Sequence, residues 1–207
     1  MWGNTESFSD WAERTHQQLI AREPATVPCG TCTACCRAGQ FIHVDAREVA
    51  AEVIPAEYLV PAPGAPGQLL LGHLPNGACP MLIHEQCSIY ADRPLACRTY
   101  DCRIFAAADV YPDGPQQEIA ERARTWSFKY RDDSDRAYHQ AVKNAARFLN
   151  HHSQTLLGGP VNEIQISLAA LKLRKLFNQQ AARTQSDYDP AGESAGFIER
   201  AKAVLQP

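Results

Sequence analysis

Cysteines are distributed very unevenly along this chain, and their distribution restricts the fold more than any other feature of the sequence. All eight fall between residues 29 and 102, and none occurs in residues 103–207. Four of them lie in the stretch CGTCTACC, at residues 29–36. A cysteine-rich loop with few apolar side chains needs cross-links or a metal to hold it. The later cysteines, at 79, 87, 97 and 102, are too far apart to share one tight turn, so their segment is expected to fold back against residues 29–36.

The composition favours metal binding over disulfide bonds. Eight cysteines among 207 residues is a lower density than in short secreted disulfide-rich domains. The first residues, MWGNTESFSDW, lack the basic and apolar regions of a signal peptide, and no run approaches the ~18 apolar residues of a membrane span. We therefore expect a cytoplasmic protein with reduced thiols. The net charge of −3, without basic blocks, indicates neither a nucleic-acid partner nor a membrane surface.

The spacing of the first three cysteines, Cys29-x2-Cys32-x2-Cys35, leaves several kinds of metal site open. A zinc knuckle uses one Cys-x2-Cys pair, whereas three cysteines at this spacing are typical of the run that wraps a cubane iron–sulfur cluster. The usual fourth cysteine of that run is missing, since Cys36 follows Cys35 directly, but a Cys-Pro pair occurs at Cys79. The first grouping that we predict is therefore Cys29, Cys32, Cys35 and Cys79 on one metal centre. Eight thiolates are also consistent with two four-sulfur sites, one polynuclear cluster, or one site and a spare redox pair.

Arginines next to cysteines support the metal hypothesis. Arg37, Arg98 and Arg103 each follow a cysteine directly. Four thiolates on a divalent metal carry a net charge near −2, which nearby guanidinium groups would offset. His84 lies among the later cysteines and is a possible nitrogen ligand, although a solvated loop histidine is the simpler interpretation.

The periodicity predicts a mainly α protein with a small irregular or β cysteine-rich metal module, and with helices from both termini packed around it. We expect an N-terminal helix within residues 1–24, the module in 25–105, and a helical region in 106–207. Helical segments are predicted at 5–22, 115–130, 134–157, 160–182 and 193–205, with Asp133 or Ser134 as an N-cap and Gly158-Gly159 as a stop. Within the module, a strand is predicted at QLLLGHL and a short helix, capped by Asp45, at AREVAAEVI.

The two cysteine segments together resemble the CxxCxxCC cysteine-cluster family, also called YkgJ-like or zinc- or iron-chelating domain proteins. The family signature is a Cys-x2-Cys-x2-Cys-Cys run, a Cys-Pro-aromatic-Leu element, and then Cys-x-Ile-Tyr-x-x-Arg-Pro-x-x-Cys-Arg. The matching positions are Cys29, Cys32, Cys35, Cys36, Cys79, Pro80, Leu82, Cys87, Ile89, Tyr90, Arg93, Pro94, Cys97 and Arg98, with Cys102 as the eighth cysteine. Met81 replaces the usual aromatic residue and Ala91 a common acidic one. The resemblance implies a metal-chelating module with all eight cysteines as ligands and Arg93 beside them.

The sequence thus favours a metal-binding protein with an eight-cysteine cluster, iron–sulfur over zinc, in a redox, metal-handling or structural role with an unknown protein or redox partner. One alternative is an enzyme that uses the cluster as cofactor, a transferase or oxidoreductase, because family members related to flagellin lysine methylases carry the same cluster. Another is a zinc-stabilised interaction module. No triad, phosphate loop or nucleotide fingerprint is recognisable in the sequence, so the catalytic residues are unknown. The candidate acid–base groups are His43, Asp45, His73, His84, Tyr90, Tyr100 and Asp101.

Overall fold

The computed structural model describes residues 6–25, 27, 29–159, 161–179 and 187–206. Its contacts divide the chain into two units that are discontinuous in sequence. The cysteine unit comprises Gln18–Asp101 and Asp113–Arg122, and the helical unit comprises the described residues of Met1–Gln17, Cys102–Pro112 and Ala123–Pro207. The chain therefore passes between the units four times.

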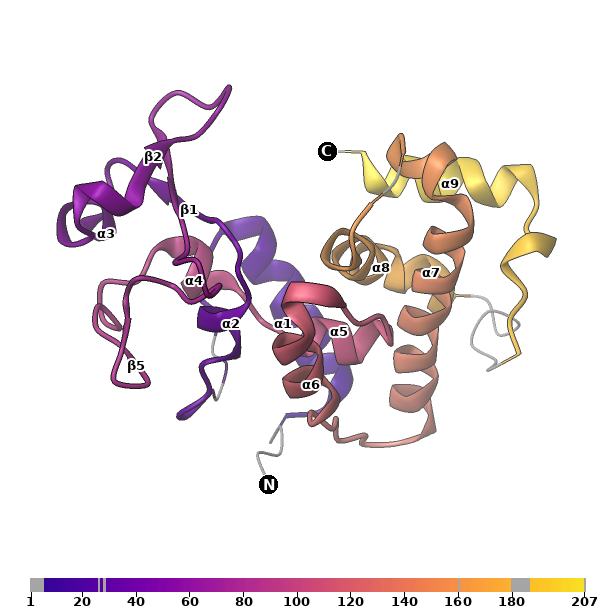
Figure 1. Cartoon of the computed structure of the whole chain (residues 1–207). Coiled ribbons are helices and arrows are strands. Elements are labelled where there is room, and N and C mark those ends of the chain that lie inside the picture. The colour runs from indigo at the N-terminus through magenta and orange to yellow at the C-terminus, as the bar shows by residue number, and fades with distance from the viewer. Residues whose placement is uncertain (1–5, 26, 28, 160, 180–186, 207) are drawn as a thin grey trace. The chain divides into compact units, whose positions relative to one another are not determined.

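The cysteine unit contains a three-stranded antiparallel sheet (Figure 1). Its strands are β1 (Ile42–Asp45), β2 (Leu59–Pro61) and β3 (Gln68–Leu71), in the order β1-β3-β2. The short helices α3 (Val49–Val53) and η1 (Ala56–Tyr58) connect the first two strands.

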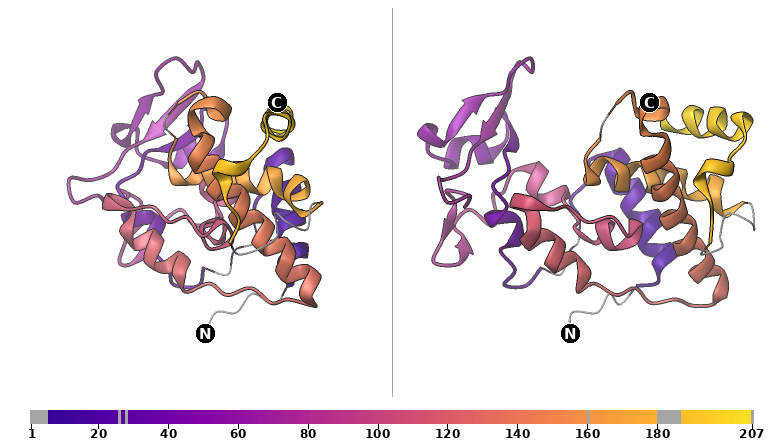
Figure 2. Two further views of the ribbon diagram at one scale, coloured as in Figure 1. Left: turned by 90° about the vertical axis from the view of Figure 1, so that its right-hand side faces the viewer. Right: turned by 45° about the vertical axis from the view of Figure 1, so that its right-hand side comes forward.

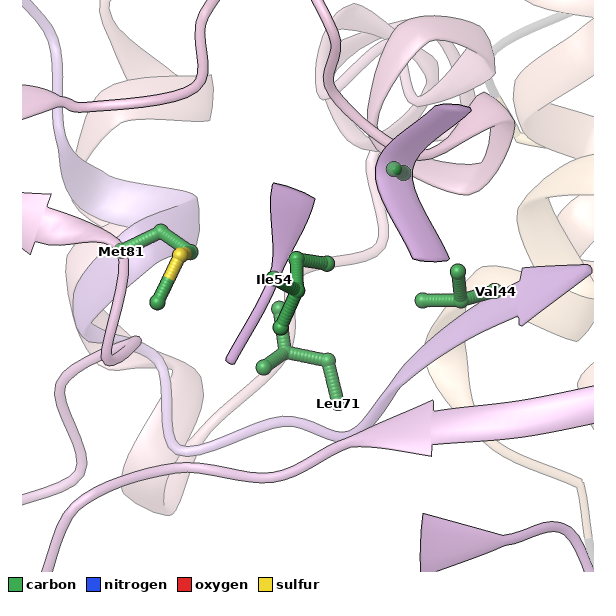
Figure 3. Close-up of a cluster of buried hydrophobic side chains, with 5 residues drawn as sticks. Val44, Ile54, Leu71 and Met81 are labelled. Carbon is green, nitrogen blue, oxygen red and sulfur yellow. The ribbon is translucent and has the colours of Figure 1, made fainter. Parts of the chain in front are cut away.

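The sheet of the cysteine unit packs on a small apolar core. The buried members of this core are Val44, Ala50, Ile54, Leu71 and Met81. Side chains alternate along a strand, so Val44 is buried while the preceding His43 is exposed. Figure 3 shows Val44, Ile54, Leu71 and Met81 gathered from separate segments of this unit. Cys79 packs against the same core, which fixes one end of the cysteine segment.

The cysteine-bearing elements of this unit are short. They are the helix α2 (Ala34–Arg37), the hairpin strands β4 (Leu82–Ile83) and β5 (Gln86–Cys87), and the helix α4 (Leu95–Thr99). The unit also contains η2 (Gly114–Gln116) and most of α6 (Gln117–Arg124).

The helical unit is built around two long helices that pack against each other (Figure 2). Its elements are most of α1 (Phe8–Ala21), α5 (Arg103–Ala108), α7 (Asp133–Leu157), α8 (Glu163–Asn178), η4 (Pro190–Gly192) and α9 (Ala195–Leu205). Alanines at 141, 145 and 170 are fully buried and allow α7 and α8 to approach closely. Asn162 forms a capping box with Gln165 at the start of α8, and Gly158 ends α7 at a φ of 78°.

A neutral histidine is buried in the helical unit. His139 of α7 is 6% exposed, and its ring stacks on Phe8 at a centroid distance of 4.0 Å. Tyr130 Oη lies 2.7 Å from Nδ1, and Nε2 lies 3.1 Å from the Ala107 carbonyl oxygen. The neutral ring can satisfy both contacts if Nε2–H donates to Ala107 and Nδ1 accepts from Tyr130. Burial lowers the pKa of His139 to about 4, and the Lys143 ammonium acts in the same direction.

The predicted fold class, mainly α with a small irregular or β module, is confirmed. The N-terminal helix, the strand at QLLLGHL and the stop at Gly158 are present, whereas residues 1–5, 160, 180–186 and 207 lie outside the described residues. None of the helices in the described ranges is both long enough and apolar enough to cross a membrane.

Several predicted helix bounds were wrong. The helices predicted at 160–182 and 193–205 begin at Glu163 and Ala195, and three further errors have a local cause. The helix after β1 begins at Val49 and not after Asp45, because Asp45 ends the strand and Glu48 Oε1 accepts from the Asp45 N–H at 3.2 Å. The N-cap of α7 is Asp132, one residue before the prediction, and its Oδ1 accepts from Asp135 N at 2.9 Å. The segment 115–130 is helical only as far as Arg124, since Lys129 pairs with the backbone of Ser7 and Phe8.

Candidate metal centre

The first cysteines lie in a tight turn that leads into α2. Gly30 adopts a φ of 58°, which a side chain would disfavour, and Cys32 N donates to the Cys29 carbonyl at 3.0 Å. The turn therefore brings the two cysteines of the first Cys-x2-Cys pair close together. Burial raises the pKa of the Cys29 thiol, and the neighbouring Cys32 raises it further.

Two glycines allow the backbone of the first cysteine segment to run directly beside that of the second. Gly39 and Gly77 both have positive φ, 61° and 82°, and Gly39 N donates to the Gly77 carbonyl at 3.0 Å. A Cβ atom at Gly77 would lie 3.5 Å from the Arg37 carbonyl oxygen. This close approach positions Cys79, whose N–H donates to the Cys36 carbonyl at 2.6 Å. Cys36 and Cys79 are therefore joined through their backbones.

The β4–β5 hairpin contributes the next cysteine. Leu82 N donates to the Cys79 carbonyl at 2.9 Å, and Leu82 pairs with Cys87 across the hairpin. The hairpin thereby turns the chain back so that Cys87 lies near Cys79.

Helix α4 contributes Cys97, and a carboxylate outside the cysteine segments holds this helix. Glu48 Oε2 accepts from Leu95 N at 2.7 Å, in the first turn of α4, and lies 3.7 Å from Arg98 Nη2. A negative charge at a helix N-terminus is favourable. Glu48 therefore fixes the start of α4, the helix on which Cys97 lies. The sequence did not indicate this role, because Glu48 is far from Leu95 along the chain.

Neighbouring sulfurs add to the effect of burial on the pKa of three cysteines. Burial, with a smaller contribution from the sulfurs of Cys79 and Cys87, raises the pKa of the Cys36 thiol to about 11. Burial, again followed by Cys79 and Cys36, raises the pKa of the Cys97 thiol to about 12. The pKa of Cys79 is raised by burial and also by Cys87. Half-buried thiols at such positions release their protons when a metal cation replaces them. Cys36, Cys79, Cys87 and Cys97 thus lie in one neighbourhood of sulfurs, and Cys32 is also close enough to Cys36 to raise its pKa.

One arginine acts on several of these thiols. The Arg93 guanidinium lowers the pKa of Cys29, Cys36 and Cys97 against the effect of burial. It is held by the ring of Tyr90, with its Cζ 3.7 Å from the ring centroid, and by a 2.9 Å hydrogen bond from Nε to the Tyr90 carbonyl.

The other arginines differ in their surroundings. Arg122 of α6 also lowers the pKa of Cys29, although no sequence signal near residue 122 pointed to the cysteines. The side chain of Arg37 pairs with Glu85, and that of Arg98 lies near Glu48. Arg103 is 2% exposed and belongs to the helical unit, where its Cζ lies 5.9 Å from the ring centroids of Trp11 and Trp126.

Seven of the eight cysteines are half-buried residues of the cysteine unit, and Cys102 is a buried residue of the helical unit. Cys102 precedes α5 as its N-cap, and Trp126 Nε1 donates to its Sγ at 3.2 Å. In the part of the chain that the structure describes, no three His, Cys, Asp or Glu side chains are placed so that they could hold a metal ion together. The donor set fits a soft metal, since it is rich in thiols, while the sulfurs are near one another without forming a closed coordination shell.

The candidate acid–base groups have separate environments. His43, His73 and His84 are exposed, and Asp45 accepts hydrogen bonds from Arg47 and Gln68. Tyr90 holds Arg93, which explains its presence without a catalytic role. Tyr100 and Asp101 follow α4, and Asp101 is buried. His84 is at the tip of the β4–β5 hairpin, where its backbone has a φ of 48°.

A half-buried group of thiols beside a small core, with guanidinium groups near it, defines a cysteine-cluster chelating module. Residues 28–127 match the family model described as "CxxCxxCC: Putative zinc- or iron-chelating domain", which confirms the resemblance found in the sequence. The matched segment includes all eight cysteines. No curated protein and no solved structure gives a significant match to the chain.

Proposed function

We propose that this zinc- or iron-chelating protein binds one metal centre through Cys36, Cys79, Cys87 and Cys97. The observation that carries this grouping is the 2.6 Å hydrogen bond that joins Cys79 N to the Cys36 carbonyl, together with the contributions of Cys36, Cys79 and Cys87 to the raised pKa of Cys97. The repeated two-residue spacing in the sequence instead predicts a centre with Cys29, Cys32, Cys35 and Cys79. The backbone hydrogen bond between Cys79 and Cys36 supports Cys36 as a ligand of the centre to which Cys79 belongs, so we favour the first grouping.

The remaining cysteines of the cysteine unit supply a second centre in this proposal. Cys29, Cys32 and Cys35 keep the spacing that is typical of cubane ligands. Burial and the neighbouring Cys32 raise the pKa of the Cys29 thiol, so Cys29 is protonated when no cation is bound. Such a thiol would lose its proton on binding a metal.

We favour an iron–sulfur cluster over zinc as the resident group. The spacing of the first three cysteines supports it, and Arg93 places a positive charge where an anionic cluster would need one. A cluster of this kind would carry single electrons to or from a protein partner in a reducing cytoplasm. Zinc with four thiolates would have no open position for catalysis and would make the module structural.

Purification without oxygen, followed by iron, zinc and acid-labile sulfide analysis, tests the proposal. We expect a brown protein with a broad absorption band that dithionite bleaches. A colourless protein with about two zinc ions per chain would replace iron–sulfur with structural zinc. A protein with neither metal above background would refute metal chelation altogether.

Paired serine substitutions test which cysteines share a centre. If Cys36 and Cys79 belong to one centre, the variants Cys36→Ser, Cys79→Ser and the double variant should each lose the same half of the wild-type metal. The double variant Cys29→Ser/Cys36→Ser should lose nearly all of it. If the spacing-based grouping is correct instead, Cys36→Ser/Cys79→Ser will lose both centres and Cys29→Ser/Cys79→Ser only one.

A further inference from the structure

The hairpin that carries Cys87 has a turn that its sequence does not favour. β4 and β5 pair Ile83 with Gln86, so the loop between them consists of His84 and Glu85 alone. Both loop residues have positive φ, 48° and 62°. Two-residue hairpin loops of this kind normally use Asn-Gly, because L-residues with side chains rarely adopt the left-handed region. The turn therefore requires support from elsewhere in the structure.

The hairpin itself provides little of that support. Each of its strands has only two residues, and Ile83, His84, Glu85 and Gln86 are all exposed. Hairpins this small are marginal when isolated in water.

The base of the hairpin is anchored on the apolar core. The amide and hydroxyl of Ser88 both donate to the carbonyl of buried Met81, at 2.9 and 3.1 Å. The tip, by contrast, lies beyond the reach of these bonds.

An ion pair connects the tip to the first cysteine segment. Glu85 Oε2 pairs with Arg37 Nη2, across 48 residues of sequence. Arg37 is braced on its own helix by a 3.3 Å hydrogen bond from Nε to Thr33 Oγ1. Arg37 directly follows Cys36, and Glu85 is two residues before Cys87. The pair thus bridges the two segments that carry Cys36 and Cys87.

We propose that Arg37 and Glu85 are positioning residues, whose ion pair holds the strained hairpin against α2 and keeps Cys87 beside Cys36 for metal binding. This inference rests on the proposed function, since it takes both cysteines as ligands of one centre. The pair acts on the rate of metal release and leaves the set of ligands unchanged. Arg37 then acts by pairing with the Glu85 carboxylate. This role is additional to offsetting the negative charge of metal-bound thiolates, which the sequence predicts.

Metal release from the protein as isolated tests this role. Zinc is followed with pyridylazoresorcinol, or iron with bathophenanthroline, for the wild type and the variants Glu85→Gln, Arg37→Glu, and Arg37→Glu/Glu85→Arg. Exposed ion pairs contribute modestly, so we expect Glu85→Gln to release metal about three- to five-fold faster, with unchanged stoichiometry. The charge-reversed double variant should return toward the wild-type rate. Raising the salt concentration should accelerate release from the wild type but not from Glu85→Gln.

Arg47→Gln is the matched control. Arg47 forms an exposed ion pair with Asp45 at 2.7 Å in the same unit, and neither residue neighbours a cysteine. Its removal should leave the release rate unchanged.

Amide hydrogen exchange of residues 82–88 gives a readout that does not depend on metal. Exchange should be faster in Glu85→Gln than in the wild type and in Arg47→Gln. If Glu85→Gln binds the full amount of metal, and releases it and exchanges its amides at wild-type rates, the positioning role is refuted while the proposed function stands. A wild type without metal would refute the proposed function instead, and the exchange data alone would then decide whether the pair holds the hairpin.

Discussion

Replacing buried His139 should reduce the loss of stability that the helical unit undergoes between pH 7 and pH 4. The folded protein lowers the pKa of this histidine from its usual value of 6.5 to about 4, mainly through burial. One unit of pKa shift corresponds to about 1.4 kcal/mol, so the whole shift of His139 corresponds to about 3–4 kcal/mol. Because the unfolded chain binds the proton more tightly, this contribution is fully present above pH 6.5, declines as the pH falls toward about 4, and changes no further below that value.

Urea unfolding followed by tryptophan fluorescence measures the effect, because Trp11 and Trp126 are both buried in the helical unit. The free-energy difference between the wild type and His139→Gln should shrink by about 3 kcal/mol between pH 7 and pH 4. Groups that titrate in both proteins cancel in that difference. His151→Gln, at an exposed position of the same helix, is the control and should follow the wild type. A difference that stays constant over this pH range would refute the description of His139 as a buried neutral ring.

Three further outcomes are expected. His84→Asn should slow hydrogen exchange in the β4–β5 hairpin roughly two- to five-fold, because asparagine tolerates the φ of 48° better than histidine does; unchanged or faster exchange would contradict the strain at this turn. Arg93→Gln should weaken metal retention in a chelator competition, and Arg93→Lys should restore part of it, since the charge is kept but the stacking on Tyr90 is not; equal losses in the two variants would indicate a packing role without charge. Chelator treatment should expose residues 25–101 to proteases while the helical unit remains protected, because the cysteine unit buries few apolar side chains besides its five-residue core. Unchanged cleavage would show that this core suffices without metal.

The sequence predicted best the elements whose hydrophobic periodicity and capping residues indicate the same bounds. The long helix that ends at Gly158 was predicted to within one residue at its start, because its buried positions recur at helical spacing and a glycine stops it. The error at its N-cap arose from three consecutive polar residues that can all cap. Asp132 is the cap because its backbone is extended, and sequence alone does not show that.

The cysteine site was predictable in its residues and less so in their arrangement. The spacing of Cys29, Cys32 and Cys35 suggested that these three act together, whereas the neighbour of Cys79 depends on Gly39 and Gly77 and the backbone approach that they permit. The contribution of Arg122 depends on the return of residues 113–122 to the cysteine unit. Neither feature has a local sequence signal, because both arise from contacts between segments far apart in the chain.

Helix α5 lies inside the segment that matches the family model, but it packs on helices that lie outside that segment. All six residues of α5 are buried, and the helix packs on α7 and α8, which begin after residue 127, where the family match ends. A protein cut back to residues 28–127 would expose this apolar helix to water, and we expect it to aggregate whether or not metal is bound. In evolution, a relative that keeps an apolar helix at this position but has a different C-terminal region would have to cover it with another apolar surface. In this chain, the segment that matches the family model therefore needs the helices that follow it in order to bury its own apolar surface.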